Sequence, residues 1–163
     1  MSNVIATDVQ TQEINSALIE LFEITLPNGT TLYFHPGLDS DLTDVQFRDK
    51  TSPYTIRDYN PMPMMIDGLE LQADGASSRP AFTVANIGTL FQTELGDFKN
   101  DDLIGERLIR RQTLRKYLVG GAEDASPPIE FSSQEYIIDR IAEENSTSIT
   151  YEVATPFDLE NIQ

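Results

Sequence analysis

A short acidic segment, Asp39 to Asp44, has the residue types that come closest to a metal-binding motif in this chain. Asp39, Asp41 and Thr43 place oxygen atoms at alternate positions, as the first ligands of an EF-hand calcium loop do. The pattern then fails, because the sixth position is Asp44 where the turn needs glycine and the twelfth is Lys50 where the ion needs a bidentate glutamate. The sequence therefore predicts a solvated loop and no metal site.

The residues that could support catalysis form no recognisable pattern. His35 is the only histidine, and the sequence contains neither a nucleophile elbow nor an HExxH motif. Two catalytic carboxylates could be chosen from the 27 acidic residues, but a glycosidase needs a spatial separation that sequence does not reveal. We expect no catalytic residue and no cofactor, and hence a protein that is not an enzyme.

Basic residues are concentrated in one region of an acidic chain. Six of the eleven cations fall within eighteen positions: Lys99, Arg107, Arg110, Arg111, Arg115 and Lys116. In a ring of identical subunits, a basic edge on one copy can meet an acidic surface on the next and fix their orientation. We therefore predict a subunit interface here. The alternative is a strand whose arginines pair within the same subunit, where exposed pairs contribute only about 0–1 kcal/mol each.

The net charge of −16 disfavours nucleic-acid binding, because an acidic surface repels phosphates. Two interpretations stay open: the acidity lines a conduit through which DNA passes without adhering, or it only keeps the protein soluble. Zero cysteines exclude disulfides, thiolate zinc sites and iron–sulfur ligation by this sequence. With no apolar run near the roughly 20 residues of a bilayer span and no secretory signal pattern, we expect synthesis in the cytoplasm and no membrane contact.

The spacing of apolar residues and turn signals predicts a mainly β protein, an antiparallel barrel or sandwich with one short helix. At 163 residues one domain is expected, with an N-terminal arm over residues 1–16, a β domain over 17–157 and a tail over 158–163. Predicted strands cover residues 17–26, 31–34, 54–56, 64–66, 107–118, 132–141 and 146–154, with a loop over 35–53 and a helix within 87–97. Residues 134–144 also suit a helical period, but we prefer a strand.

The segment from Met64 to Asn86 predicts a hairpin: Leu69 and Leu71 alternate with polar residues, and Asp74-Gly75 suits a tight turn. It resembles the minor tail protein L family of long-tailed phages, the lambda-type tail-tip proteins. The matching positions are Gly68, Leu69, Glu70, Leu71, Gly75, Ser78, Arg79, Pro80, Thr83, Val84, Ala85 and Asn86. Two further blocks follow in the family's order: Leu103-Ile104-Gly105 with Arg110-Arg111 and Tyr117-Leu118, then Ile149 to Val153 with Thr155-Pro156.

The resemblance implies a structural protein of the virion tail tip: a hub or adaptor ring that joins the tail tube or distal tail protein to the central tip protein and lines the DNA conduit. It implies a homo-oligomer, with a trimer favoured and a hexamer possible. Arg79 matches the family, and we expect it in a buried or interfacial ion pair with an acidic residue of a nearby strand.

The family continues into a cysteine-rich region implied to hold an iron–sulfur cluster, so the resemblance covers the first domain alone. The competing interpretation is a carbohydrate- or cell-surface-binding β-sandwich that uses its six tyrosines as stacking platforms.

Overall fold

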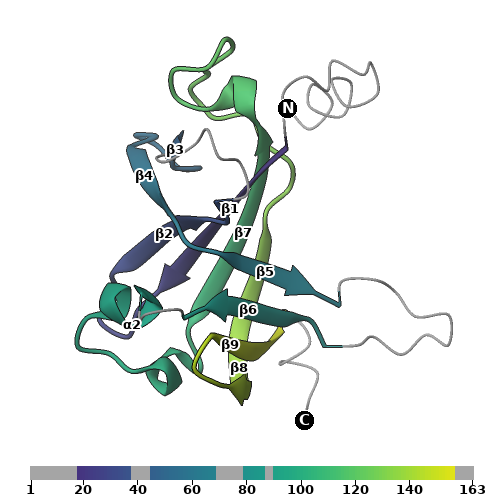
Figure 1. Cartoon of the computed structure of the whole chain (residues 1–163). Helices are drawn as coiled ribbons and strands as arrows, with labels where there is room; N and C mark the ends of the chain where they lie inside the picture. Colours follow the sequence, from purple (N-terminus) through teal and green to yellow (C-terminus); the bar gives the residue numbers. More distant parts are fainter. Residues whose placement is uncertain (1–17, 38–44, 69–78, 87–89, 157–163) are drawn as a thin grey trace, which may run out of the picture. The chain divides into compact units, whose positions relative to one another are not determined.

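Strands dominate the chain, as Figure 1 shows for the computed structural model, which describes residues 18–37, 45–68, 79–86 and 90–156. The nine strands are β1 (Leu18–Thr25), β2 (Thr31–His35), β3 (Val45–Arg48), β4 (Ile56–Pro61), β5 (Met64–Asp67), β6 (Ala81–Ala85), β7 (Arg107–Leu114), β8 (Gln134–Glu144) and β9 (Ser148–Ala154). The helical elements in these residues are α2 (Leu90–Leu95) and the 3-10 turns η2 (Asn100–Leu103) and η3 (Arg115–Tyr117). The predictions of a mainly β protein and of a short helix are confirmed.

The strands are hydrogen-bonded in the order β3-β4-β2-β1-β7-β8-β9-β6-β5, which ends in two edges. The described strands therefore form an open sheet and not a closed barrel. The sheet is also mixed, because β2 and β4 run parallel with Phe34 opposite Asn60. An antiparallel arrangement throughout was the expectation from sequence. The long connection between β2 and β4 makes the parallel pair possible, since a parallel crossover needs about a dozen residues or more.

Contacts divide the chain into two compact units, each built from three segments. Unit 1 comprises Met1–Phe22, Tyr33–Pro61 and Ile109–Gln134, and unit 2 comprises Glu23–Leu32, Met62–Leu108 and Glu135–Gln163. Strands β1, β2, β7 and β8 contribute residues to both units.

The core of unit 1 is a cluster of buried apolar and aromatic side chains: Ile19, Leu21, Val45, Phe47, Tyr59 and Leu118. Tyr33 packs on this cluster, with its ring edge-on to Tyr59 at a centroid distance of 5.3 Å. Such a pair adds about 0.5–1.5 kcal/mol beyond the burial of its apolar area. Strand β3, which supplies Val45 and Phe47, lies within the segment predicted as a loop, so that prediction was wrong. Its four residues are too few to show a strand period.

Strand β1 confirms the strand predicted for residues 17–26 but changes the face that it buries. Ile19 and Leu21 are buried in its first half, and Phe22 and Ile24 in its second half. A single two-residue period would bury only one of these pairs. The change of phase falls where the chain passes from unit 1 to unit 2, and it explains why the sequence alternates only in part.

Unit 2 has its core on one face of β6 and β9. Phe82 and Val84 are buried, as their alternation predicts, and they lie opposite Tyr151 and Ile149 of β9. The rings of Phe82 and Tyr151 stack at 6.3 Å, and on the other face the hydroxyls of Thr83 and Thr150 lie 3.1 Å apart. These cross-strand pairs fix the register of the two strands.

Several sequence predictions on pairing need correction or lie outside the described residues. The expected pair of strands around residues 54–56 and 64–66 does not form, because β4 pairs with β3 and β2 whereas β5 pairs with β6. The strand predicted to Leu118 ends at Leu114, where η3 begins. The predicted turn at Asp74-Gly75, the acidic loop, the N-terminal arm and the C-terminal tail lie outside the described residues, and the single-domain boundaries stay a prediction.

The β8–β9 hairpin confirms the strand interpretation of residues 134–144, and Asn145 holds its turn. The side-chain Oδ1 of Asn145 accepts hydrogen bonds from the backbone N–H groups of Thr147 and Ser148, both at 2.9 Å, and from the Thr147 hydroxyl at 2.8 Å. We predict that Asn145→Ala lowers the free energy of unfolding by about 1–2 kcal/mol, because three donors lose their acceptor in a solvated turn. Urea unfolding measures the loss. Asn145→Asp, which keeps the acceptor, is the matched control, and equal losses in both variants would contradict the role of the side-chain oxygen.

Candidate interaction surface

Strand β7 and the turn η3 position most of the cations predicted to form a subunit interface. Along β7 the buried side chains are Leu108, Arg111, Thr113 and Leu114, whereas Arg107 is exposed. Arg111 occupies a position that the strand period would give to an apolar residue. One member of the predicted interface is therefore a core residue.

Arg111 is 1% exposed and lies in a closed network of polar groups inside unit 1. Its Nε lies 3.1 Å from both carboxylate oxygens of Glu130, and a second guanidinium nitrogen also bonds that carboxylate. The remaining donors reach the Tyr59 hydroxyl at 3.1 Å and the backbone carbonyl of Arg48 at 2.9 Å. The guanidinium also lies 4.6 Å from the centre of the Phe47 ring. The geometry uses the planar fork of arginine, which a lysine cannot reproduce.

The sequence did not allow the hydrogen-bond partners of Arg111 to be predicted. Glu130 has a side chain that is 8% exposed, and it follows two prolines in a segment without a strand or helix period. Tyr59 belongs to β4, and its hydroxyl is buried with its ring. A buried arginine needs a buried carboxylate, but the sequence offers 27 acidic residues and no local signal that selects Glu130.

Four of the other predicted interface cations also have acidic partners in their own chain. Arg110 donates to Glu20 at 2.6 and 3.1 Å and to the Gln134 side chain at 3.0 Å. The remaining ion pairs are Arg107–Glu135 at 2.7 Å, Lys116–Glu123 at 3.6 Å and Arg79–Asp139. The expectation that Arg79 pairs with an acidic residue of a nearby strand is confirmed, since Asp139 lies in β8. The side chain of Arg79 is 44% exposed, so the pair is not buried.

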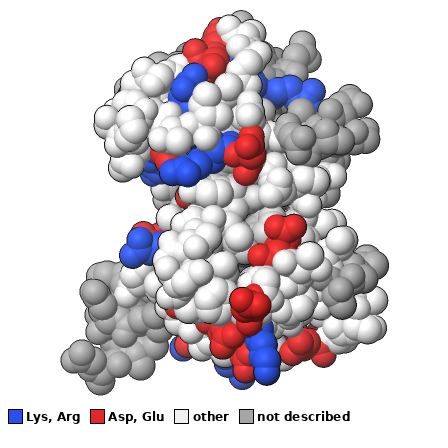
Figure 2. All heavy atoms as spheres, turned by 90° about the vertical axis from the view of Figure 1, so that its left-hand side faces the viewer, with Lys and Arg blue, Asp and Glu red and all other residues white. Residues whose placement is uncertain are grey.

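The structure thus favours the alternative in which the cations pair within one subunit. Arg110, Arg111, Arg115 and Lys116 belong to unit 1, whereas Arg79 and Arg107 belong to unit 2. On the face drawn in Figure 2, basic and acidic side chains lie next to each other and form no broad surface of positive charge. An interface between subunits at these six residues stays a prediction.

The remaining candidates from the sequence were the single histidine, a metal site and the tyrosines. His35 is buried, and its Nδ1 accepts a hydrogen bond from the backbone of Gly37 at 3.2 Å. Among the described residues no group of three His, Cys, Asp or Glu side chains could hold a metal ion. In the same residues no helix has the length and apolar character needed to cross a membrane. Four of the six tyrosines are buried, which excludes them as stacking platforms for a sugar: Tyr59, Tyr117, Tyr136 and Tyr151.

Comparison with known proteins decides the family. The sequence profile described as phage minor tail protein L matches residues 28–163, which is most of the chain. The chain belongs to the phage minor tail protein L family. The tail tip protein L of Escherichia phage lambda is 29% identical over 154 residues, an alignment that covers 90% of this chain and 62% of the lambda protein. The family resemblance inferred from the three sequence blocks is therefore confirmed.

Membership of the minor tail protein L family identifies a structural protein of the phage tail, and hence a component of the virion. The chain spans less than two thirds of the length of its lambda relative. The iron–sulfur cluster implied for the cysteine-rich region of the family does not fit the residues present here, because the sequence contains no cysteine. No function of this chain is derived from that cluster.

Proposed function

We propose that this tail protein is a hub or adaptor ring of the tail tip, which joins the tail tube or distal tail protein to the central tip protein. The observation that carries the proposal is the family match over residues 28–163, together with the alignment to a tail tip protein over 90% of the chain. Its role is assembly and not catalysis. The ring is a homo-oligomer, a trimer in the first instance and a hexamer as the alternative.

The charge distribution supports a surface along which DNA can pass. Unit 2 contains 16 of the 27 acidic residues and 4 of the 11 basic ones. Nine of the eleven cations form ion pairs within the chain, so they are not available to phosphates. An acidic surface with few spare cations repels duplex DNA over a Debye length, about 8 Å at physiological salt. This is the property that a DNA conduit needs.

The first test of this proposal is genetic. A phage with the gene interrupted is expected to yield particles without functional tips and no plaques, and a plasmid copy of the gene is expected to restore both. Antibody-gold labelling of complete virions is expected at the end of the tail distal to the capsid. Label along the tail shaft or on the capsid, or normal plaques without the protein, would contradict the tail-tip role.

The interface at the exposed cations is tested by charge reversal. Arg79→Glu together with Arg107→Glu is predicted to leave the chain folded, because both side chains are about half exposed. Incorporation into tails, measured by complementation of the interrupted phage, is predicted to fall at least tenfold, since the reversed charges repel the acidic surface of the next copy, at about 1.4 kcal/mol for each factor of ten. Arg140→Glu is the matched control, because Arg140 is 65% exposed in unit 2 and outside the predicted interface. Equal losses in the interface and control variants would contradict the assignment.

A further inference from the structure

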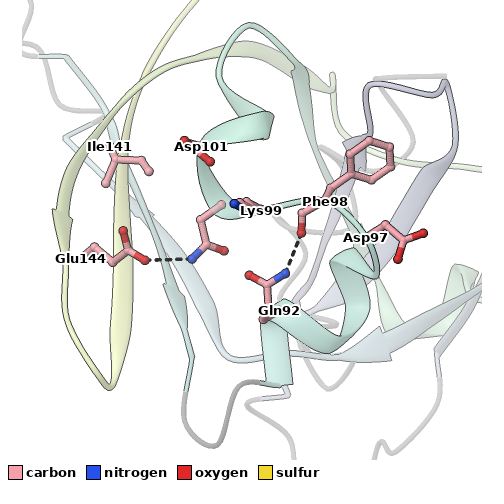
Figure 3. Close-up of a pocket in the computed structure, with 8 residues that line it drawn as sticks. Gln92, Asp97, Phe98, Lys99, Asp101, Ile141 and Glu144 are labelled. Atoms are coloured by element: carbon pink, nitrogen blue, oxygen red, sulfur yellow. Dashed lines mark hydrogen bonds between the residues drawn. The ribbon is translucent and has the colours of Figure 1, made fainter.

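Unit 2 contains an open groove between the tip of the β8–β9 hairpin and the segment that connects α2 with η2. Its volume is about 770 Å³. Glu144 of β8 accepts a hydrogen bond from the side-chain N–H of Asn100 at 3.0 Å, and Figure 3 shows Glu144 across the groove from Asp101 and Lys99. Ile141 precedes Glu144 on the same strand and gives the groove an apolar wall. The opposite wall is held by Gln92, which donates to the backbone carbonyl of Phe98 at 2.6 Å.

The groove presents more hydrogen-bond acceptors and negative charge than donors. Asp97, Asp101 and Glu144 line it, and Lys99 is its single cation. The side-chain oxygen of Asn100 accepts no hydrogen bond from the described residues. Under the groove, the Tyr151 hydroxyl donates to the Asn100 carbonyl at 3.0 Å, and the pKa of that tyrosine is raised by burial and by the charges of Glu144 and Asp101. Burial is the larger cause of this rise, and the two carboxylates add to it.

These features suit a lysine or arginine side chain. A long basic side chain can lay its aliphatic stem along an apolar wall such as Ile141 while its head reaches carboxylates at the rim. The head also supplies the donors that the groove lacks. Because three carboxylates line the groove with one resident lysine, the balance of charge favours an incoming cation.

A second copy of this chain has little to offer the groove. All eleven cations lie in described residues, and nine of them already form ion pairs within the chain. Arg115, the tenth, is engaged in its own chain, and Lys99 lies in the groove itself. Charge complementarity therefore favours a basic segment of a different protein.

We propose that this groove docks a segment of another tail protein that presents lysine or arginine side chains. The inference rests on the proposed function, because it names the chemistry of a partner for a tail-tip adaptor. It does not depend on the ring stoichiometry or on the cations of β7.

The test is the titration of the full chain with a hexa-arginine peptide, followed by amide chemical shifts and by calorimetry at low salt. Shifts are expected in residues 92–101 and 141–144. Asp101→Asn with Glu144→Gln, which keeps the bond to Asn100, is expected to weaken binding about fivefold, because two exposed charge pairs contribute about 0.5 kcal/mol each. Lys99→Gln is expected to tighten binding, since it removes the competing cation. Asp67→Asn with Glu135→Gln removes the same charge elsewhere in unit 2 and is the matched control.

Three outcomes would overturn the inference: shifts outside the groove, equal weakening by the groove and control variants, or no binding. Sedimentation of the groove variant tests the choice of occupant, because a loss of self-association would mean that a second copy fills the groove. Complementation of the interrupted phage separates this inference from the proposed function. If the chain is required for the tail tip but the peptide does not bind in the groove, the proposed function stands and only the docking inference is wrong.

Discussion

Replacing Arg111 with alanine is expected to lower the free energy of unfolding by about 3–5 kcal/mol, the cost of breaking a buried ion pair by removing one partner. Glu130 would remain in a site where its side chain is 8% exposed, and the Tyr59 hydroxyl and the Arg48 carbonyl would each lose a donor. Lys50 lies 3.9 Å from Glu130 and is the only other cation paired with it among the described residues, so it can compensate in part. Since a domain is stabilised by about 5–15 kcal/mol in total, the variant is expected to be partly unfolded at 37 °C.

Chemical denaturation measures this loss, provided that the free energy of unfolding depends on denaturant concentration with the same slope in the variant and the natural protein. Two further variants locate the origin of the loss. Arg107→Ala removes a cation from the same strand at a position 57% exposed, so a loss of at most about 1 kcal/mol is expected. Arg111→Met combined with Glu130→Leu replaces the buried pair with apolar groups and is expected to recover most of the stability. If Arg111→Ala costs less than about 1 kcal/mol, or if the double variant is no more stable than the single one, the network does not hold unit 1 together as described.

Because Arg111 is buried, a charge reversal that includes this residue does not test an interface between subunits. From sequence, reversing Arg110 and Arg111 to glutamate is expected to leave the domain folded and to block assembly. With Arg111 in the core, the reversal would place a second carboxylate beside Glu130 and unfold unit 1. A failure to enter tails would then report misfolding and not a lost interface, and for that reason the exposed pair Arg79 and Arg107 carries the test.

The fold class and most strands could be predicted because their signals are local. The period of residues 17–26, the turn at Pro27-Asn28-Gly29 and the turn at Asn145 depend on neighbours in sequence. The N–H of Leu26 bonds the carbonyl of Thr30 at 2.7 Å, and Gly29 adopts a φ of 87° that suits glycine. The family could be inferred for the same reason, since its blocks are short and ordered.

The features that sequence could not give are long-range pairings. The parallel partner of β2 and the existence of β3 depend on which strands meet. Val45–Arg48 alternates apolar and polar residues, but four residues are too short a run to identify a strand from sequence. An interface at the clustered cations stays a prediction, but the partners of these cations within the chain could not be predicted from the sequence for a related reason. Charge concentrated along the sequence indicated a surface, but several of these cations pair with carboxylates that are distant in sequence, such as Glu20 for Arg110. Pairing of this kind depends on tertiary structure, and the spacing of residues in the sequence does not indicate it.

Gly121→Ala is expected to lower the free energy of unfolding by about 1–3 kcal/mol, because there is no space for its Cβ. An added Cβ would lie 2.5 Å from the backbone oxygen of Lys116 and 2.9 Å from that of Arg115. These are main-chain atoms that cannot turn aside as the end of a side chain can. The neighbouring Gly120 is the matched control: its φ is 83° and nothing lies within 4 Å of its Cβ, so Gly120→Ala costs only the strain of a left-handed residue, about 1 kcal/mol.

The two glycine variants are expected to differ in more than stability, because the segment around Gly121 protects an edge of the sheet. The N–H of Val119 donates to the carbonyl of Gln46 in β3 at 3.0 Å, and Asp124 pairs with Arg48 at the end of the same strand. Strand β3 is one of the two edges, and an uncovered edge is a template for association with other chains. Gly121→Ala is therefore expected to speed amide exchange at Val119 and to increase aggregation on heating, whereas Gly120→Ala is not. If amide exchange at Val119 and aggregation on heating are the same in both variants, the segment does not cover the edge. The loss of stability in Gly121→Ala is then confined to the loop that contains Gly121.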